Sequence, residues 1–508
     1  MAEVEGRRDA GTVTRPVVAG EPTGDALRVD VAVVGAGAAG LYAALCAARE
    51  GARVALVSRS PLAESASYWA QGGIAAAVAP DDSPERHMRD TVAAGRRAAR
   101  ESAARVLSEE SPGCVRDLEA LGVHFDADRH GAVALGLEGG HSARRVVHAG
   151  GSATGRRITR DLSALAAVDE RIAVLERTTA SSLVVRDGRC VGLVAEPTRG
   201  GPRRLVQARG TVFATGGAAA LWRRTTNPRG AIGAGLTLAA AAGAALADLE
   251  LVQFHPTALV SEGERDGFLI TEAIRGEGAL LVNGEGERFV DELAPRDEVA
   301  LAVQRELREG SGTVNLDMRE IDGARFPNVT AALLDAGLDP SRELVPVAPA
   351  AHYTMGGIAT DLDGRSTLPG LLAVGECACN GLHGANRLAS NSLAECFVFG
   401  RRAALASAGE PVPEGPVEPP AEVPDPVPPR PTRDALWRRA GLERSPEDLE
   451  ELAGDPFPLA RMIAASALAR EESRGAHQRR DHPRQDPGLD GMHAVSRAGE
   501  RPVFERWT

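Results

Sequence analysis

The first half of the chain alternates between short apolar runs and longer segments with helical spacing. The run Val29–Val34 is a candidate buried strand and Ala39–Glu50 a candidate helix, while Arg53–Ser58 and Thr211–Thr215 are further candidate strands. This alternation continues to about Asp248. It favours a parallel sheet that is covered by helices on both faces.

A different pattern begins near residue 249. From Leu249 to His352 the chain is more polar and mixed, with a turn signal at Asn283-Gly284. The apolar run Gly370–Val374 then has the character of another buried strand. We therefore predict that residues 249–352 form an inserted domain, and that residues 28–248 and 353–410 together form one domain that is discontinuous in sequence.

The two ends of the chain differ from this core. Residues 1–27 carry charge and lack an apolar centre, which predicts a flexible arm rather than a signal peptide or membrane anchor. Ten prolines lie within residues 411–431, which favours extended conformations and predicts a linker over residues 411–432. Helical spacing follows from Arg433, so residues 433–508 are expected to form a small helical C-terminal domain.

Composition narrows the classes of function. The chain has 508 residues, of which 43% are hydrophobic, and a formal net charge of -12, which argues against a nucleic-acid partner. All 58 lysine or arginine positions are arginine, so a lysine Schiff base and pyridoxal phosphate chemistry are excluded. No segment has the uninterrupted apolar length of a transmembrane helix. The six cysteines are scattered without metal-ligand spacing, and no metal site is predicted.

A glycine motif stands at the first strand-to-helix junction. Gly35, Gly37 and Gly40 form G-x-G-x-x-G directly after the first strand and at the start of the first helix. Such glycines allow a tight turn, the approach of backbone to a pyrophosphate, and close packing of helix on strand. The acidic residue expected at the end of the second strand is absent, because Ser58 stands there. The sequence therefore predicts a dinucleotide site that is not an ordinary NAD site; a glycine-rich turn without a ligand is the alternative.

Three further loops of small residues lie where a long flavin cofactor needs them. They are Ser67–Gly73, Ala214–Gly217 after a predicted strand, and Gly375-Glu376 after another. Each alone is common turn chemistry. Together they allow backbone to approach a flat ring, which favours a flavin.

Longer strings in residues 28–400 resemble the succinate dehydrogenase and fumarate reductase flavoprotein superfamily, and within it the branch that oxidises L-aspartate. The resemblance implies an α/β fold, with a Rossmann-like FAD-binding domain, an inserted α+β capping domain and a small helical C-terminal domain. The strings that carry it are Ala70–Gly73, Phe254–Thr257, Thr271–Ala273 with Arg275–Gly278, Asp291–Asp297, His352–Gly357, His383–Arg387 and Asn391–Leu393.

The resemblance implies FAD as the cofactor. Superfamily members with covalent FAD attach it to a histidine four residues before the Ala-Gln-Gly-Gly string, where this chain has Ala66, so noncovalent FAD is expected. Ala234 also departs from the pattern, since it stands where the family usually has an aspartate near the flavin. The residues expected to bind FAD are Gly35, Ala36, Gly37, Ala38, Ala39, Gly40, Ser58, Ser65, Ser67, Ala70, Gln71, Gly72, Gly73, Thr215, Gly216, Gly217, Glu376, Asn391, Ser392 and Leu393.

A pocket for L-aspartate must neutralise two carboxylates and recognise one ammonium group. The guanidinium of Arg387 suits a bidentate grip on a carboxylate. The remaining roles come from the resemblance, which implies that Glu138 orients the amino group and that Arg296 transfers a proton. It also implies that carboxylates are bound by His255, Thr271 and His352, and that Gln253 and Glu272 line the same pocket. The catalytic set expected is thus Glu138, His255, Arg296, His352 and Arg387.

The function implied is FAD-dependent oxidation of L-aspartate to iminoaspartate, with oxygen or fumarate as the electron acceptor. This is the first step of the route through quinolinate to NAD, so a cytoplasmic protein and a possible quinolinate synthase partner are expected. A soluble fumarate reductase or succinate-oxidising flavoprotein is the nearest alternative. A flavin-free nucleotide-binding or scaffold protein is a third.

Overall fold

The computed structural model describes residues 14–16, 26–415, 417–420 and 422–508. Most of the predicted N-terminal arm lies outside the described residues. Within them, strand β1 (Thr14–Pro16) pairs antiparallel with β19 (Glu422–Pro424). Residues 14–16 of the predicted flexible arm are therefore paired, and the extended conformation expected of the proline-rich linker occurs in β19, where a short edge strand tolerates proline.

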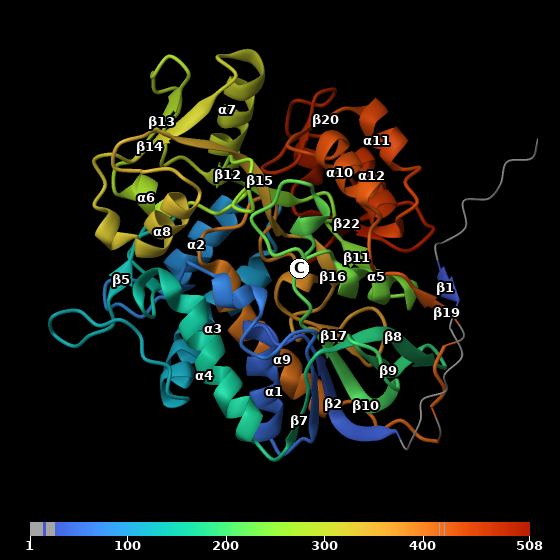
Figure 1. Ribbon diagram of the computed structural model, residues 1–508. Helices are drawn as coiled ribbons and strands as arrows, with labels where there is room; N and C mark the ends of the chain where they lie inside the picture. The colour runs from blue at the N-terminus through green and yellow to red at the C-terminus, as the bar shows by residue number, and fades with distance from the viewer. Residues whose placement is uncertain (1–13, 17–25, 416, 421) are drawn as a thin grey trace, which may run out of the picture.

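A seven-stranded sheet forms the base of the molecule in Figure 1. Its order is β7-β3-β2-β10-β9-β8, and β17 also pairs with β10. Strands β7, β3, β2, β10 and β17 are parallel to one another, as predicted, while β9 pairs antiparallel with β10 and β8 pairs antiparallel with β9. The strands are β2 (Leu27–Val34), β3 (Val54–Val57), β7 (Ile172–Leu175), β8 (Thr178–Arg186), β9 (Arg189–Pro197), β10 (Arg204–Phe213) and β17 (Leu371–Ala373).

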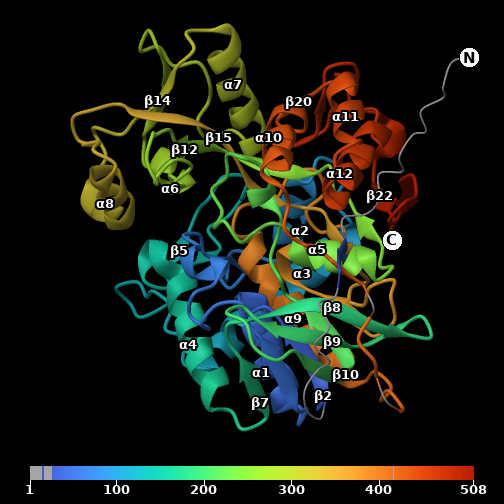
Figure 2. The same cartoon turned by 45° about the vertical axis from the view of Figure 1, so that its right-hand side comes forward.

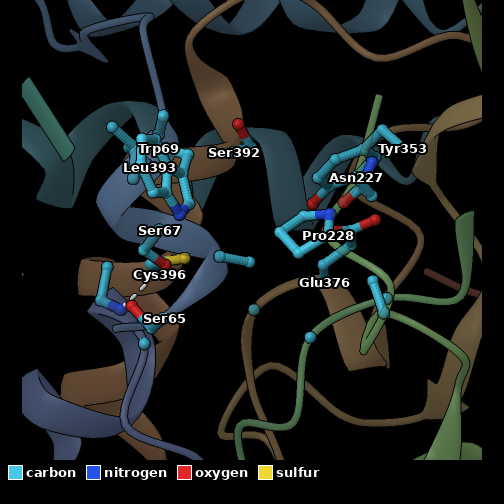
Figure 3. Close-up of a pocket in the computed structure, with 18 of the residues that line it drawn as sticks. Ser65, Ser67, Trp69, Asn227, Pro228, Tyr353, Glu376, Ser392, Leu393 and Cys396 are labelled. Carbon is cyan, nitrogen blue, oxygen red and sulfur yellow. Dashed lines mark hydrogen bonds between the residues drawn. The ribbon is translucent and has the colours of Figure 1, made fainter. Parts of the chain in front are cut away.

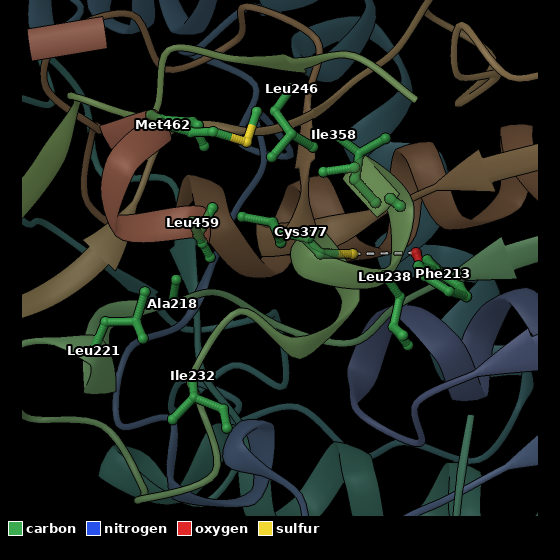
Figure 4. Close-up of a cluster of buried hydrophobic side chains, with 14 of the residues drawn as sticks. Phe213, Ala218, Leu221, Ile232, Leu238, Leu246, Ile358, Cys377, Leu459 and Met462 are labelled. Atoms are coloured by element: carbon green, nitrogen blue, oxygen red, sulfur yellow. Dashed lines mark hydrogen bonds between the residues drawn. The ribbon is translucent and has the colours of Figure 1, made fainter. Parts of the chain in front are cut away.

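Strand β2 is buried on both faces because its successive side chains enter two different cores. Val31 and Val33 pack in the core formed with helices α1 (Ala38–Arg49), α3 (Glu101–Ala120) and α9 (Asn391–Ala408). Ala32 and Val34 enter the opposite core, where Figure 4 shows Phe213, Leu238 and Leu459 converging from β10, α5 (Ala234–Ala241) and α12 (Pro458–Ala469). This two-sided burial explains why the second half of the strand, residues 31–34, is wholly apolar.

Helices α2 (Pro84–Ala94) and α4 (Thr154–Val168) lie on the same side of the sheet as α1, α3 and α9. Helix α4 packs on α1, and α2 packs on α3. A small sheet of β4 (Ile74–Ala75), β6 (Val146–Val147) and β5 (Leu135–Gly136) lies beside them.

A separate lobe is drawn in yellow at the upper left of Figure 1. It has its own hydrophobic core and a four-stranded antiparallel sheet in the order β12-β15-β14-β13. Its elements are β12 (Val252–Leu259), α6 (Glu272–Gly276), β13 (Leu280–Asn283), α7 (Arg296–Glu309), β14 (Val314–Asp317), α8 (Pro327–Asp335) and β15 (Val345–Thr354). The α+β content expected of the inserted segment is confirmed, while the boundaries of the predicted domains stay a prediction.

The C-terminal part contains strands as well as helices. Its helices are α10 (Arg430–Arg439), α11 (Pro446–Leu452) and α12, so helix begins within the predicted linker. Strands β20 (Glu443–Arg444) and β21 (Gln478–Arg479) pair with each other, while β22 (Met492–Ser496) and β23 (Val503–Arg506) join β11 (Leu246–Ala247), β16 (Gly357–Ala359) and β18 (Ala378–Cys379) in a five-stranded sheet. The chain end is therefore bound to the body of the protein by strand pairing.

Among the described residues, no helix is both long and apolar enough to cross a bilayer.

Candidate active site

The G-x-G-x-x-G turn packs as tightly as its glycines suggest. Gly35 has a φ of 107°, and a Cβ there would lie 2.2 Å from the carbonyl oxygen of Ala214. A Cβ on Gly40 would lie 1.9 Å from the carbonyl oxygen of Gly35. Gly40 therefore closes the helix onto the strand, and the N-terminus of α1 is left facing a cleft.

This cleft has a volume of about 650 Å³ and runs from the end of β2 to the inserted lobe. In Figure 3 Ser65, Ser67, Trp69, Leu393 and Cys396 lie on one side of it, and Asn227, Pro228, Tyr353 and Glu376 lie on the other. Of the residues predicted to bind FAD, those that line the cleft are Gly35, Ala36, Gly37, Ala38, Ala39, Ser58, Ser65, Ser67, Ala70, Gln71, Gly72, Gly73, Thr215, Gly216, Gly217, Glu376, Ser392 and Leu393.

Two residues of the predicted FAD set lie outside the cleft lining. One is Gly40, which packs behind the turn. The other is Asn391, which is fully buried; its carboxamide oxygen lies 2.8 Å from Nε2 of His87, and its Nδ2 donates to Thr91 at 2.9 Å. Asn391 thus joins α9 to α2. Ala234 begins α5 and likewise is not among the described residues that line the cleft.

The polar groups of the cleft fit a long cofactor such as FAD. Ser65 Oγ and Gln71 Oε1 are buried and have no hydrogen-bond partner within the described part of the chain. A buried polar atom without a partner is unfavourable, so both atoms are suited to a ligand. Ser67 holds the turn by accepting a hydrogen bond of 3.1 Å from the Ala38 amide.

Glu376 is the acidic residue among the predicted cofactor contacts. Burial raises its pKa to about 7, although Oε1 accepts a hydrogen bond of 3.0 Å from the Thr354 amide. A Cβ on Gly217 would lie 2.1 Å from Glu376 Oε1, so this glycine leaves room for the carboxylate.

At the other end of the cleft, which we call the inner end, side chains from the inserted lobe meet those of the first domain. His255 on β12 and His352 on β15 face each other, with ring centroids 5.1 Å apart. Thr271 precedes α6 and Arg296 begins α7. The predicted set that lines this end consists of Glu138, His255, Thr271, Glu272, Arg296, His352 and Arg387.

Gln253 is the predicted pocket residue that does not line the cleft. Its Oε1 accepts hydrogen bonds of 3.2 Å from both Arg296 and Arg387. Its Nε2 donates to Asn386 Oδ1 at 2.9 Å and to the Arg387 carbonyl at 3.0 Å. Gln253 therefore fixes the spacing of two guanidinium groups from behind.

Arg387 is held on several sides while remaining in the cleft. It donates to Ser392 Oγ at 3.1 Å, and its Nη2 lies 3.3 Å from Nε2 of His352. Its guanidinium also lies 4.7 Å from the ring centroid of Tyr353. Because arginine only donates, His352 Nε2 accepts this bond, and Nδ1 carries the proton toward Thr226 Oγ1 at 2.8 Å.

The electrostatics of this end favour anions. Burial together with Arg296 and its neighbouring guanidiniums holds the pKa of His255 and of His352 well below the usual value, so both rings are neutral at pH 7. Burial and Arg296 also lower the pKa of Arg387 to about 10, which still leaves it charged at pH 7.

Glu272 is the counter-ion of this end. Burial acts to raise its pKa, but Arg296 and Arg275 outweigh burial and lower it to about 2. Its Oε2 accepts a hydrogen bond of 2.7 Å from Arg296 Nε. Arg275 is itself buried and lies 3.6 Å from the same carboxylate. Three guanidiniums, Arg275, Arg296 and Arg387, therefore surround one carboxylate, and this end retains excess positive charge.

Several lining residues were not predicted as site residues. Asn227 and Pro228 lie on the wall opposite Trp69, and Tyr353 lies under Arg387. Tyr353 falls inside the resemblance string that begins at His352, which was a usable signal. Ser390 gave no such signal, and its position depends on a φ of 59° that sequence spacing does not reveal.

Two family models match the chain. Residues 30–393 match the family described as FAD binding domain, and residues 434–500 match the family described as fumarate reductase flavoprotein C-term.

Curated relatives share much of the sequence. An L-aspartate oxidase of Caulobacter vibrioides is 46% identical over 485 residues, which cover 90% of this chain and 94% of the relative. An L-aspartate oxidase of Mesorhizobium japonicum is 44% identical, with 94% of this chain and 96% of the relative covered.

Solved structures share the fold. A mutated E. coli quinol fumarate reductase FrdA superimposes with a TM-score of 0.86 at 30% identity, covering 94% of this chain and 97% of that chain. Mycobacterium smegmatis Sdh1 does so with a TM-score of 0.82 at 31% identity, covering 95% of each chain.

Proposed function

The chain belongs to the L-aspartate oxidase family of FAD-binding flavoproteins, and we propose that it oxidises L-aspartate to iminoaspartate at the inner end of the cleft. Electrons pass to oxygen or to fumarate. The reaction is the first step of de novo NAD biosynthesis through quinolinate, and we place it in the cytoplasm.

One observation carries this proposal: the charges lining the inner end match those of L-aspartate. Arg296, Arg387 and the neutral ring of His255 offer hydrogen-bond donors for two carboxylates. Glu138 lines the same cleft, and its carboxylate accepts a hydrogen bond of 2.6 Å from the Ser390 hydroxyl. A carboxylate in this place suits an ammonium group and disfavours a plain dicarboxylate.

The roles of the individual residues follow from these charges. Arg387 grips one substrate carboxylate and is oriented by its hydrogen bond to His352, while His255 and Thr271 bind the other. Glu138 orients the amino group so that the hydrogen on the α carbon points along the cleft. Gln253 lies behind the pocket and fixes the spacing of the Arg296 and Arg387 guanidiniums by accepting a hydrogen bond from each.

Arg296 compensates charge near the reacting carbon, and Glu272 holds its guanidinium in place. Arginine is a reluctant acid, with an ordinary pKa above about 12. A proton transfer through Arg296 therefore depends on its contacts with Glu272 and Gln253 and on its side chain being only 12% exposed.

The part of the cleft that begins at the glycine turn, away from the inner end, is the proposed FAD site. The glycine turn and the N-terminus of α1 suit the pyrophosphate, while Gln71 and the loops Gly72-Gly73 and Thr215–Gly217 suit the isoalloxazine part. FAD bound here supplies the hydride acceptor of the reaction. The chain's own contribution is binding, orientation and the exclusion of water.

A soluble fumarate reductase remains the second candidate, because the guanidinium-rich end also suits fumarate and FrdA shares the fold. The two activities differ in their need for Glu138, since fumarate has no amino group.

Turnover distinguishes the candidates. With L-aspartate and oxygen, the FAD-loaded protein is expected to form hydrogen peroxide and, after hydrolysis of the imine, oxaloacetate and ammonia in equal amounts. Succinate in place of L-aspartate is the matched control. Peroxide from succinate but not from L-aspartate would exclude the proposed function. Because iminoaspartate hydrolyses, we also propose quinolinate synthase as the partner that receives it.

A further inference from the structure

The turn between α2 and α3, residues 95–100, contains two neighbouring non-glycine residues in the left-handed region. Arg96 has a φ of 55° and Arg97 a φ of 63°. Such a backbone conformation is unfavourable for a residue with a side chain and persists only where its surroundings enforce it. The reason for this strain lies in what the turn contacts.

The side chain of Arg96 reaches the first turn of α7 in the inserted lobe. Its Nε donates to Asp297 Oδ2 at 2.8 Å, and its Nη2 donates to Asp297 Oδ1 at 3.0 Å and to Glu298 Oε1 at 2.6 Å. The Asp297 side chain is only 6% exposed. A bidentate arginine–carboxylate contact of this kind fixes orientation as well as distance. Arg296, the adjacent residue, is the one that enters the cleft.

The backbone of the same turn is held by the C-terminal part of the chain. The Arg96 carbonyl accepts a hydrogen bond of 2.7 Å from Arg474 Nη1, and the Arg97 carbonyl accepts one of 2.8 Å from the Gly491 amide. Arg474 is buried and makes two bonds of 2.8 Å to Glu472. The turn is thus held by two residues of the C-terminal part, Arg474 and Gly491.

The C-terminal part also contacts the other end of α7. Arg308, in the last turn of that helix, pairs with Glu443 of β20. In Figure 2, β20 is drawn to the right of α7. Helix α7 is therefore held near both ends, once through Arg96 and once directly.

We propose that Arg96 is a positioning residue which holds the start of α7, and with it Arg296, over the cleft, and that residues 470–491 keep Arg96 in the conformation this requires. The C-terminal part then serves the reaction by bracing the inserted lobe. For its kinetic consequences this inference rests on the proposed oxidation of L-aspartate.

The test compares three variants of the full FAD-loaded chain with the unmodified protein. Arg96→Gly removes the side chain while glycine suits the left-handed backbone, so the turn itself is spared. Asp297→Asn weakens the same contact from the other side, and the third variant combines both. Arg97→Gly is the matched control, since Arg97 is left-handed too but its side chain is 78% exposed and lies 3.5 Å from Asp490.

We expect each of the two single variants to lower kcat for L-aspartate by about tenfold with FAD content unchanged. The double variant should lose no more activity than either single variant, because both substitutions remove the same contact. Arg97→Gly is expected to stay within about twofold, as for surface substitutions. Losses that multiply in the double variant, or an equal loss in the control, would overturn the inference.

Hydrogen exchange separates this inference from the proposed function. In Arg96→Gly, faster exchange is expected in residues 291–303 and not in α1 or α9, whatever the substrate. The paired substitution Arg474→Met with Glu472→Leu, which leaves no unpaired buried charge, should produce the same local signature. Unchanged exchange in α7 in either variant would contradict the inference that Arg96 and the C-terminal part hold this helix in place. If exchange changes as expected but L-aspartate does not reduce the flavin of the unmodified protein, only the proposed function fails.

Discussion

The Ser390 hydroxyl donates a hydrogen bond of 2.6 Å to the carboxylate of Glu138. The same oxygen accepts a hydrogen bond of 3.1 Å from the Gly73 amide. Ser390 is buried and left-handed, with a φ of 59°. The carboxylate proposed to read the substrate's amino group is thereby fixed to a loop of the proposed FAD site.

Replacing Glu138 with glutamine tests that assignment. The amide keeps the size of the side chain and loses the charge that attracts an ammonium group. A hydrogen bond to a charged partner contributes about 1.5 to 3 kcal/mol, so kcat/KM for L-aspartate should fall by roughly tenfold to a hundredfold. Fumarate reduction by the same variant, measured with a reduced dye, should fall much less. Equal losses in both reactions would remove the amino-orienting role.

Arg296→Leu is expected to abolish turnover while FAD stays bound. The substitution removes the guanidinium that we propose faces the reacting carbon, and loss of one such electrostatic contact commonly lowers kcat by about a hundredfold to a thousandfold. Flavin absorbance and turnover are measured on the same sample. Arg305→Leu, an exposed position on the same helix, is the control. Substantial activity in Arg296→Leu would take this residue off the catalytic set.

The cofactor should leave the chain when the protein is denatured in acid. Ala66 offers no side-chain nitrogen at the position where covalent relatives carry the attachment histidine. After precipitation, all of the flavin absorbance is expected in the supernatant. Flavin that stays with the precipitated chain would show a covalent link elsewhere.

Stability should fall in mild acid because of buried neutral histidines. Burial lowers the pKa of His87 to about 4, and burial with nearby guanidiniums holds the pKa of His255, His352 and His477 well below the usual value. Unfolding lets these rings regain a pKa of about 6.5. The folded state therefore has its full stability above that pH and loses it as the pH falls, since the unfolded chain binds more protons.

The check is the thermal midpoint at pH 7.5 and at pH 5.5. We expect a lower midpoint at pH 5.5 and a smaller drop in His87→Gln, which removes one of the buried rings. His124→Gln changes an exposed ring and should leave the drop as it is. A midpoint that does not depend on pH in this window would contradict the neutral burial of these histidines.

The sequence predicted those parts of the fold and site that depend on local patterns. The apolar β2, the glycine turn and α1 follow one another within residues 27–49, so short-range rules suffice. Pairing of β22 with β11 was not predictable in this way, because Val495 and Ala247 are neighbours in space while far apart in sequence. The helices α10, α11 and α12 of the C-terminal domain were expected from the sequence, whereas its strands β22 and β23 were not.

At the inner end of the cleft, prediction from the sequence was limited in the same way, because the arrangement depends on residues far apart in the chain. Strings such as His352–Gly357 marked residues by resemblance, yet the way in which Gln253 joins Arg296 and Arg387 depends on three separate elements meeting. The left-handed backbone of Ser390 and Arg96 could not be predicted from the sequence either, since neither residue type favours that conformation. Tertiary contacts enforce these conformations.

Anaerobic mixing with L-aspartate, D-aspartate and succinate, each followed by flavin absorbance, tests the central claim most directly. The account predicts that L-aspartate bleaches the flavin rapidly, that succinate does so far more slowly, and that D-aspartate, whose α hydrogen points away when Glu138 holds the amine, leaves it oxidised. A flavin that succinate reduces as fast as L-aspartate does, or that L-aspartate leaves oxidised, would contradict it.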